Sequence, residues 1–410
     1  MKPIDFKYGK TVYPIDMPEQ CNQLTIQEPD HKIDIQQFET DFAESLPKTL
    51  SNEAAISIAV ADKTRLCEYA VFLPVLLKVF SQRKISASNI TFFIAYGTHA
   101  RQSDEQCLSA YGDLYHTCRF VHHDCSNKDL FVRIGDTQSG TPVHIRKDLL
   151  DSDLIITFGA LSHHYFAGYG GGRKLLFPGL GYKDDIYKNH SLFLDRTEKQ
   201  LSPGCQPGNL NDNPLALDLK QIDDYLTQPR ISIHGILNSK GKVCQLIIGN
   251  SYNDFLKACS ILDTFYRVSD PRQYPLVIAS CGGFPKDINL IQAHKAINNA
   301  ATFVLDGGTL IVMAQCSEGV GSDTFLPYFD HSSFDAAFCA LQNDYKGNGG
   351  TALSMMSKAR RINVFLKTDL DDKICKTIGV KKLNCQEIEQ FINKNQQETA
   401  CIENASLLIR

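Results

Sequence analysis

Short apolar runs that alternate with helical patterns are the feature of this sequence that most restricts its fold. The clearest runs in the first half cover residues 55–60, 90–96 and 154–158. Largely apolar runs of this length are typical of strands that are buried on both faces, as in a parallel sheet. Helical patterns follow the first two runs, over 66–81 and 103–110. The alternation predicts an α/β fold with a mainly parallel sheet flanked by helices.

The same pattern starts again in the second half of the chain. Residues 276–280, 309–314 and 362–366 have the composition of strands, and a Ser-Asp-Pro break precedes the first of them. A chain of 410 residues is long enough for two domains of ordinary size. We expect residues 1–268 to form the first domain and residues 269–410 a second α/β domain, with the active site in the cleft between them.

Composition and charge exclude several classes of protein. A hydrophobic content of 43% and a charged content of 21% are typical of a globular protein in water. The net charge of −4, without any Lys/Arg cluster, argues against nucleic acid as a partner. No apolar run reaches the roughly 18 residues that a membrane span needs, and residues 1–7 lack the apolar core expected of a signal peptide. The 14 cysteines include no C-x-x-C pair, which favours free thiols in a reducing cytoplasm.

Polar side chains follow the end of each of the first three runs. Residues 62–65 (Asp-Lys-Thr-Arg) come after the first run, His99 follows the second, and His164 and Lys174 follow the third. The carboxyl ends of parallel strands lie at one edge of a sheet, where α/β proteins bind their ligands. Three such coincidences favour a shared site.

Each of these signals also has a simpler interpretation. Asp62 or Thr64 could cap the helix that follows. His99 could merely bond its own turn, and the segment around Lys174 could be a glycine-rich surface turn with a solvated lysine. His163, beside His164, is expected to have a structural hydrogen-bonding role rather than that of a second ligand.

The glycine run at 170–172 matches no familiar phosphate-binding motif. Arg173 stands where both the Walker A pattern and the dinucleotide fingerprint require a glycine. Glycines do allow positive φ angles and a close approach of the backbone to a flat ligand. Lys174 beside them is either a point charge for a phosphate or, when deprotonated, a nucleophile.

Together these motifs resemble one family, the nickel-pincer lactate racemases, which racemise or epimerise 2-hydroxy acids. The resemblance covers both halves of the chain, with its motifs in the order that the family has. The matching motifs are D-K-T-R (62–65), G-T-H (97–99), H-x9-K (164–174) followed after fifteen residues by His190, G-G-F-P-K-D (282–287) and Q-x-x-K (292–295).

The resemblance implies a cofactor, the pyridinium-3,5-bisthiocarboxylic acid mononucleotide that carries nickel and is made by separate cofactor-biosynthesis enzymes. Lys174 would hold this nickel-pincer nucleotide through a thioamide bond, and His190 would be the protein's nickel ligand. Neutral imidazole suits Ni(II), and an amine acylated by a thiocarboxylate gives a stable link. The remaining cofactor-binding residues would be Asp62, Lys63, Thr64 and Arg65.

The reaction that the resemblance implies is hydride transfer to and from the cofactor at C2 of the substrate. His99 and His164 would act as the two acid/base residues, since histidine both gives and takes protons near neutral pH. Arg65, Gln292 and Lys295 would bind the substrate's carboxylate and keto oxygen.

Two departures from the lactate-specific pattern bear on the substrate. Ile291 stands where those enzymes have a tyrosine, and the chain contains no tryptophan. Loss of an aromatic wall changes the size and polarity of a pocket. The expected substrate is therefore lactate or a larger hydroxy acid or sugar acid.

Other functions remain open from the sequence. A metal-dependent hydrolase or lyase would use His164, His190 and a carboxylate as ligands. A pyridoxal phosphate enzyme would use Lys174 as its Schiff base. A two-lobed sugar-acid binding protein would need no histidines at two separate strand ends.

Overall fold

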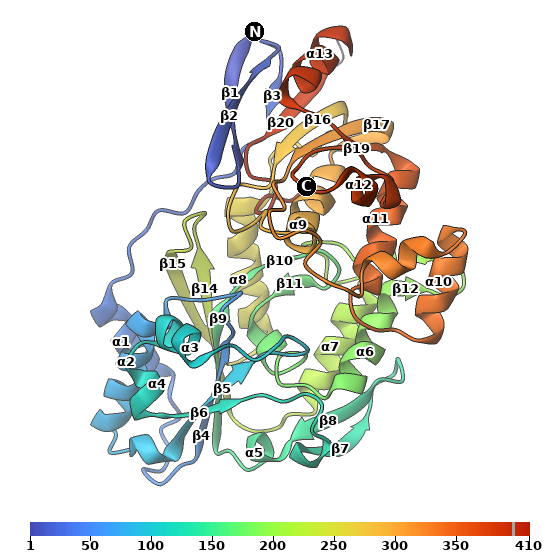
Figure 1. Cartoon of the computed structure of the whole chain (residues 1–410). Coiled ribbons are helices and arrows are strands. Elements are labelled where there is room, and N and C mark those ends of the chain that lie inside the picture. The colour runs from blue at the N-terminus through green and yellow to red at the C-terminus, as the bar shows by residue number, and fades with distance from the viewer. Residues whose placement is uncertain (396–397) are drawn as a thin grey trace. The chain divides into compact units, whose positions relative to one another are not determined.

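The computed structural model describes residues 1–395 and 398–410 (Figure 1), which form two compact units. The central unit comprises Glu28–Leu192 and Gly204–Phe265. The terminal unit comprises Met1–Gln27, Phe193–Pro203 and Tyr266–Arg410. Two segments that the sequence assigned to the first domain thus lie in the terminal unit. Its last segment begins close to the expected boundary.

The central unit contains a six-stranded sheet in the order β15-β14-β9-β4-β5-β6. All neighbours are parallel except β14 and β15, which form an antiparallel pair at one edge. The strands are β4 (Ile56–Ala61), β5 (Ile90–Ala95), β6 (Arg119–His122), β9 (Leu154–Ala160), β14 (Arg230–Leu237) and β15 (Val243–Gly249).

Helices and two small hairpins complete the central unit. The hairpins are β7–β8 (Phe131–Asp136 and Pro142–Arg146) and β10–β11 (Ser162–His164 and Gly168–Gly170). The helices are α1 (Ile35–Ser45), α2 (Tyr69–Gln82), α3 (Asp104–Tyr111), α4 (Leu114–Thr117), α5 (Lys147–Leu150), α6 (Lys183–His190), α7 (Pro214–Asp224) and α8 (Tyr252–Tyr266).

Aromatic packing fixes the central strands against the first helices. Phe158 on β9 is fully buried, and its ring centre lies 5.5 Å from that of Tyr69 in an edge-to-face contact. Phe38 on α1 and Phe72 on α2 make a second such contact at 5.5 Å. The hydroxyl of Tyr69 donates to the carbonyl of Phe158 at 2.8 Å, so its polar atom is satisfied inside the core.

The terminal unit contains a second six-stranded sheet, in the order β19-β18-β17-β16-β20-β3, in which all neighbours are parallel. Its strands are β3 (Asn22–Gln23), β16 (Tyr274–Ser280), β17 (Val304–Met313), β18 (Asn363–Lys367), β19 (Lys381–Lys382) and β20 (Thr399–Ile402). Its remaining elements are the hairpins β1–β2 (Lys2–Tyr8 and Thr11–Met17) and β12–β13 (Leu194–Asp195 and Gln200–Leu201), and the helices α9 (Leu290–Ala301), α10 (Phe334–Asn343), α11 (Gly349–Arg361), α12 (Asp372–Thr377) and α13 (Cys385–Asn395).

The fold-class prediction is confirmed, because each unit has a mainly parallel sheet accompanied by helices. A cleft between the two domains stays a prediction. No helix in the described part of the chain is both long and apolar enough to cross a membrane.

The predicted cap of α2 is wrong. This helix begins at Tyr69, and the residue before it, Glu68, has a φ of 46° and makes no capping hydrogen bond from its side chain. Asp62 and Thr64 instead lie in the turn that follows β4, seven and five residues before the helix starts. Their side chains are therefore available for the site described below.

Candidate active site

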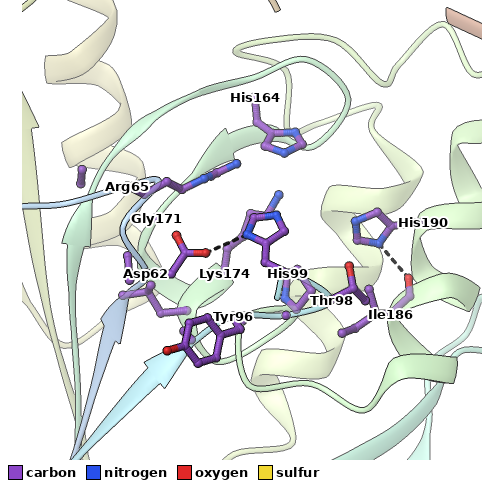
Figure 2. A pocket seen from close by; sticks show the side chains of 17 residues that line it. Asp62, Arg65, Tyr96, Thr98, His99, His164, Gly171, Lys174, Ile186 and His190 are labelled. Carbon is purple, nitrogen blue, oxygen red and sulfur yellow. Dashed lines mark hydrogen bonds and ion pairs between the residues drawn. The ribbon is translucent and has the colours of Figure 1, made fainter. Parts of the chain in front are cut away.

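A pocket lies at the carboxyl edge of the central sheet, where the order of the strands changes direction. From β4 the chain proceeds to β5 on one side, whereas β9 lies on the other side. Such a switch point is where open α/β sheets bind ligands. Figure 2 shows the polar side chains around this space, all from the central unit: Asp62, Arg65, Thr98, His99, His164, Lys174 and His190.

Asp62 and His99 form a hydrogen-bonded pair across the ends of β4 and β5. The Nδ1 atom of His99 lies 2.8 Å from Oδ2 of Asp62, whose other oxygen accepts from the backbone N–H and the hydroxyl of Thr64 at 2.9 and 2.6 Å. Burial acts to raise the pKa of Asp62, but the bonds from His99 and Thr64 hold this pKa below its usual range. The carboxylate therefore fixes the proton of His99 on Nδ1 and leaves Nε2 as the basic atom.

Lys174 supplies a buried amine without a counterion. Its side chain is 9% exposed, and Nζ lies 5.8 Å from the centre of the Phe166 ring. No hydrogen-bond acceptor among the described residues is bonded to this amine. Burial, together with the charges of Arg65 and Arg173, lowers the pKa of Lys174 well below its usual range. A lowered pKa increases the share of the uncharged, nucleophilic amine, which suits this lysine to covalent attachment.

His190 ends α6 with one ring nitrogen directed to its own helix. Nδ1 donates to the carbonyl of Ile186 at 2.7 Å, as the dashed line in Figure 2 marks. Burial and the charge of Lys174 lower the pKa of His190 to about 3. The ring is therefore neutral at pH 7, with its proton on Nδ1 and a lone pair on Nε2, which is the donor that a divalent metal binds.

Two buried carboxylates hold α6 in place. No motif in the sequence marks either of them. Asp185 accepts from the backbone N–H of His144 and lies 2.9 Å from Nδ1 of its ring. Asp218 on α7 accepts from the side-chain amide of Asn189 at 2.8 Å. Both pairs join residues at least 29 positions apart, and no local pattern reveals such partners.

His164 lies on the short strand β10, and its ring has a different environment from that of His99. The backbone N–H of Ala167 donates to Nδ1 of His164 at 3.3 Å. Nδ1 therefore carries the lone pair, and the proton of the neutral ring is on Nε2. Phe166 contacts the ring edge to face, with 4.6 Å between the centres.

The glycine run packs closely against other parts of the central unit. A Cβ atom on Gly170 would lie 2.5 Å from Nη1 of Arg65, and one on Gly171 would lie 2.4 Å from the carbonyl oxygen of Ala160. The space that these glycines leave is thus occupied by the protein itself. They allow the segment before Lys174 to pack closely on Arg65 and β9.

The structure brings together six of the predicted site residues and leaves four outside the pocket. Lys63 and Thr64 do not line it, although the backbone N–H of Lys63 donates to Gln102 at 2.9 Å. Gln292 and Lys295 lie on α9 of the terminal unit, where Nζ of Lys295 donates to Oε1 of Gln292 at 2.7 Å. No group of three His, Cys, Asp or Glu side chains suited to a metal is found in residues 1–395 and 398–410.

Comparisons with known proteins identify the family of the chain. Residues 17–202 match the family model of the lactate racemase N-terminal domain, and residues 270–343 match that of the lactate racemase C-terminal domain. The chain belongs to the lactate racemase family. It is an isomerase of the racemase type.

Curated relatives and solved structures extend the likeness over most of the chain. A lactate racemase of Thermoanaerobacterium thermosaccharolyticum is 27% identical over 81% of this chain and 79% of its own length. One of Lactiplantibacillus plantarum is 28% identical over 74% and 69%, respectively. The structure of the lactate racemase apoprotein from T. thermosaccharolyticum has a TM-score of 0.88 at 25% identity, with full coverage of both chains. A Thermotoga maritima protein shares the fold, with a TM-score of 0.68 at 13% identity over 94% of this chain and 99% of its own.

Proposed function

We propose that this chain racemises or epimerises a 2-hydroxy acid at C2 with a nickel-pincer nucleotide bound to Lys174. The observation that carries the proposal is that one pocket contains both the buried amine of Lys174, whose pKa is lowered, and the neutral ring of His190. Had the fold separated these two residues beyond the reach of one mononucleotide, the assignment would have failed.

The donor set of the pocket fits this cofactor. The lowered pKa of Lys174 favours the uncharged form of the amine that a thioamide link requires. His190 offers one imidazole lone pair, which suits Ni(II), and its Nδ1–H bond to the α6 backbone fixes the direction of that donor. Arg65, which lines the same pocket, is a cation for the cofactor phosphate or the substrate carboxylate. When bound, the cofactor would take up the C2 hydride and return it.

The two pocket histidines are arranged as a complementary acid and base. His99 presents a lone pair on Nε2, because Asp62 holds the proton on Nδ1. His164 presents an N–H on Nε2, because Nδ1 accepts from the backbone. His99 would take the hydroxyl proton from one enantiomer, while His164 supplies a proton for the other. The reverse reaction starts with the two protonation states exchanged.

Gln292 and Lys295 are proposed as further substrate-binding residues, and the substrate as lactate or a larger 2-hydroxy acid or sugar acid. The curated relatives are named lactate racemases, which supports a small 2-hydroxy acid. Ile291 and the lack of tryptophan leave room for a longer substrate than lactate.

The proposed setting is the cytoplasm, with the cofactor-biosynthesis enzymes as partners. All 14 cysteines are free thiols, ten of them buried in the structure. Thiols in this number persist where the compartment is reducing.

The test is to produce the protein together with the cofactor-making enzymes and to measure its intact mass. An increase equal to the pincer nucleotide is expected, followed by interconversion of enantiomers in a panel from lactate to six-carbon sugar acids. An unchanged mass, or a yellow chromophore that borohydride bleaches, would contradict the proposal. The second result would favour a pyridoxal phosphate enzyme instead.

A further inference from the structure

The hairpin β10–β11 presents two different faces. His164 pairs with Gly168, and His163 pairs with Tyr169. Since successive residues of a strand point to opposite faces, His164 is on one face, and His163 and Tyr169 share the other. The face with His164 lines the pocket. The opposite face, with His163 and Tyr169, can therefore bind the rest of the central unit and fix the position of the hairpin.

A single carboxylate binds both side chains of that opposite face. Oδ1 of Asp263, on α8, lies 2.7 Å from Nε2 of His163 and accepts from the hydroxyl of Tyr169 at 2.8 Å. The two rings contact each other at 5.2 Å between centres. The side chain of His163 is 6% exposed and that of Asp263 is 23% exposed. Bonds to a charged acceptor in such a setting are stronger than ordinary ones, so they restrict the hairpin effectively.

The pocket face of the same hairpin is packed against a second site residue. At Gly170, a Cβ atom would lie 2.5 Å from Nη1 of Arg65, and Ser162 lies opposite this glycine in the register. The hairpin thus fits between α8 and Arg65. Strands β10 and β11 are only three residues long. If the hairpin shifted, His164 would move and the packing around Arg65 would change with it.

We propose that Asp263 is a positioning residue for His164, acting through His163 and Tyr169 on the far face of the hairpin. The inference rests on the proposed function, in which His164 is one of two acid/base groups. It also gives His163 a role: this ring acts as the link to Asp263 and is not a ligand of the pocket. His99 depends on Asp62 instead and should be indifferent to Asp263.

The test compares Asp263→Leu, which removes both bonds, with Asp263→Asn, which keeps an acceptor oxygen. Tyr169→Phe removes the bond from the Tyr169 hydroxyl to Asp263. It replaces Asp263→Leu in the comparison if that variant fails to fold. Asp223→Asn is the matched control, because it removes a carboxylate from the ion pair with Arg230 elsewhere in the central unit. Histidine ring nitrogens of the cofactor-free proteins are followed by NMR, with His164→Gln and His99→Gln used for assignment.

In Asp263→Leu, the ring signals of His164 should change from one tautomer to a mixture, while those of His99 stay as in the parent. Asp263→Asn should show a smaller change, and Asp223→Asn none. The loaded variant, mixed with one pure enantiomer, should lose bound keto acid about tenfold or more only for the enantiomer that His164→Ala also loses.

Unchanged His164 signals, or equal losses for both enantiomers, would overturn the inference. Failure of the proposed function is recognised separately. In that case the loaded parent protein forms no keto acid from either enantiomer, and the NMR comparison still decides the role of Asp263.

Discussion

The carboxyl edges of the two sheets carry similar polar residues but use them differently. In the central unit, the residues after β4, β5 and β9 face a pocket. In the terminal unit, the switch point lies between β16 and β20, and the turn of hairpin β1–β2 reaches it (Figure 1). The backbone N–H of Gly9 donates to Oδ2 of Asp287 at 2.7 Å, and the carbonyl of Gly9 accepts from the N–H of Phe284 at 2.8 Å.

The hairpin also contacts residues that follow the neighbouring strands. The hydroxyl of Tyr8 donates to Asp369, which comes shortly after β18. A Cβ atom on Gly9 would collide with the side-chain amide of Gln315, which comes after β17. The terminal edge is therefore bonded by the chain's own amino-terminal segment, whereas the central edge keeps an amine and two imidazole nitrogens for a ligand.

This difference shows that a polar motif at a strand end does not by itself identify a site. The segment G-G-F-P-K-D (282–287) looks as informative in the sequence as D-K-T-R (62–65). Yet Asp287 accepts from the backbone of Gly9 and Gln315, and the N-cap of α9 is Asn289. What distinguishes the first motif is that Asp62 and Arg65 line a pocket.

The largest effect is expected when Lys174 is removed from the central edge, because the proposed cofactor link is then lost. Lys174→Ala removes the amine to which the nucleotide would be joined, so the mass increment should vanish completely. His190→Ala removes the proposed nickel ligand of the protein and should keep the increment while lowering the nickel content. Intact mass and metal analysis of the co-produced proteins measure the two effects. A normal increment on Lys174→Ala would place the anchor elsewhere.

The next largest effect concerns the acid/base pair. His99→Ala and His164→Ala should each reduce racemisation by a hundredfold or more, the usual scale for a positioned acid/base. Both proteins should retain the cofactor. In single turnovers with pure enantiomers, one variant should form keto acid from the R substrate and the other from the S substrate. Loss of the same enantiomer in both would refute the two-base arrangement.

The same exchange of Asp for Asn should have different effects at the two sheet edges. Asp62→Asn should slow racemisation roughly a hundredfold, because the carboxylate that orients His99 is lost. It should cost less stability than the exchange at Asp287, because Asp62 borders the pocket, where water can reach it. Asp287→Asn should lower the free energy of unfolding by about 1–3 kcal/mol, since a buried acceptor of two backbone bonds is weakened. Racemisation rates and urea midpoints measure both. Equal stability losses would mean that Asp62 is as structural as Asp287.

The smallest predicted effect is a gain of stability in the cofactor-free protein. Because the pKa of Lys174 is lowered by folding, the unfolded chain binds a proton that the folded chain lacks, up to a pH near 10.4. Lys174→Met should therefore be more stable than the parent at pH 7, and the gain should disappear above about pH 10.5. Thermal midpoints at both pH values test this. Lys257→Met, an exposed site on α8, is the control.

Most of the fold was predictable, because strands that are buried on both faces consist largely of consecutive apolar residues. The run at 154–158 became β9, and 90–96 became β5. The place of the amino-terminal hairpin was not predictable, because its partners lie about 270 residues further along the chain. For the same reason, the sequence does not reveal the pairing of Asp62 with His99, although both residues follow strand ends. Parallel neighbours bring together residues 37 positions apart without any local signal.

The parallel pairing of β3 with β20 joins residues 22–23 to residues 400–401. A ribosome must therefore finish almost the whole chain before the terminal sheet can close, whereas the last strand of the central sheet ends at Gly249. During synthesis, the central unit would have time to fold while the amino-terminal hairpin waits for its strands. Ribosome-bound chains stopped at residue 300 should accordingly resist protease within residues 56–249 but be cut within residues 2–17. Misassembly would be a hazard during that interval, and chaperones that bind nascent chains would be needed at residues 2–17 rather than in the central unit.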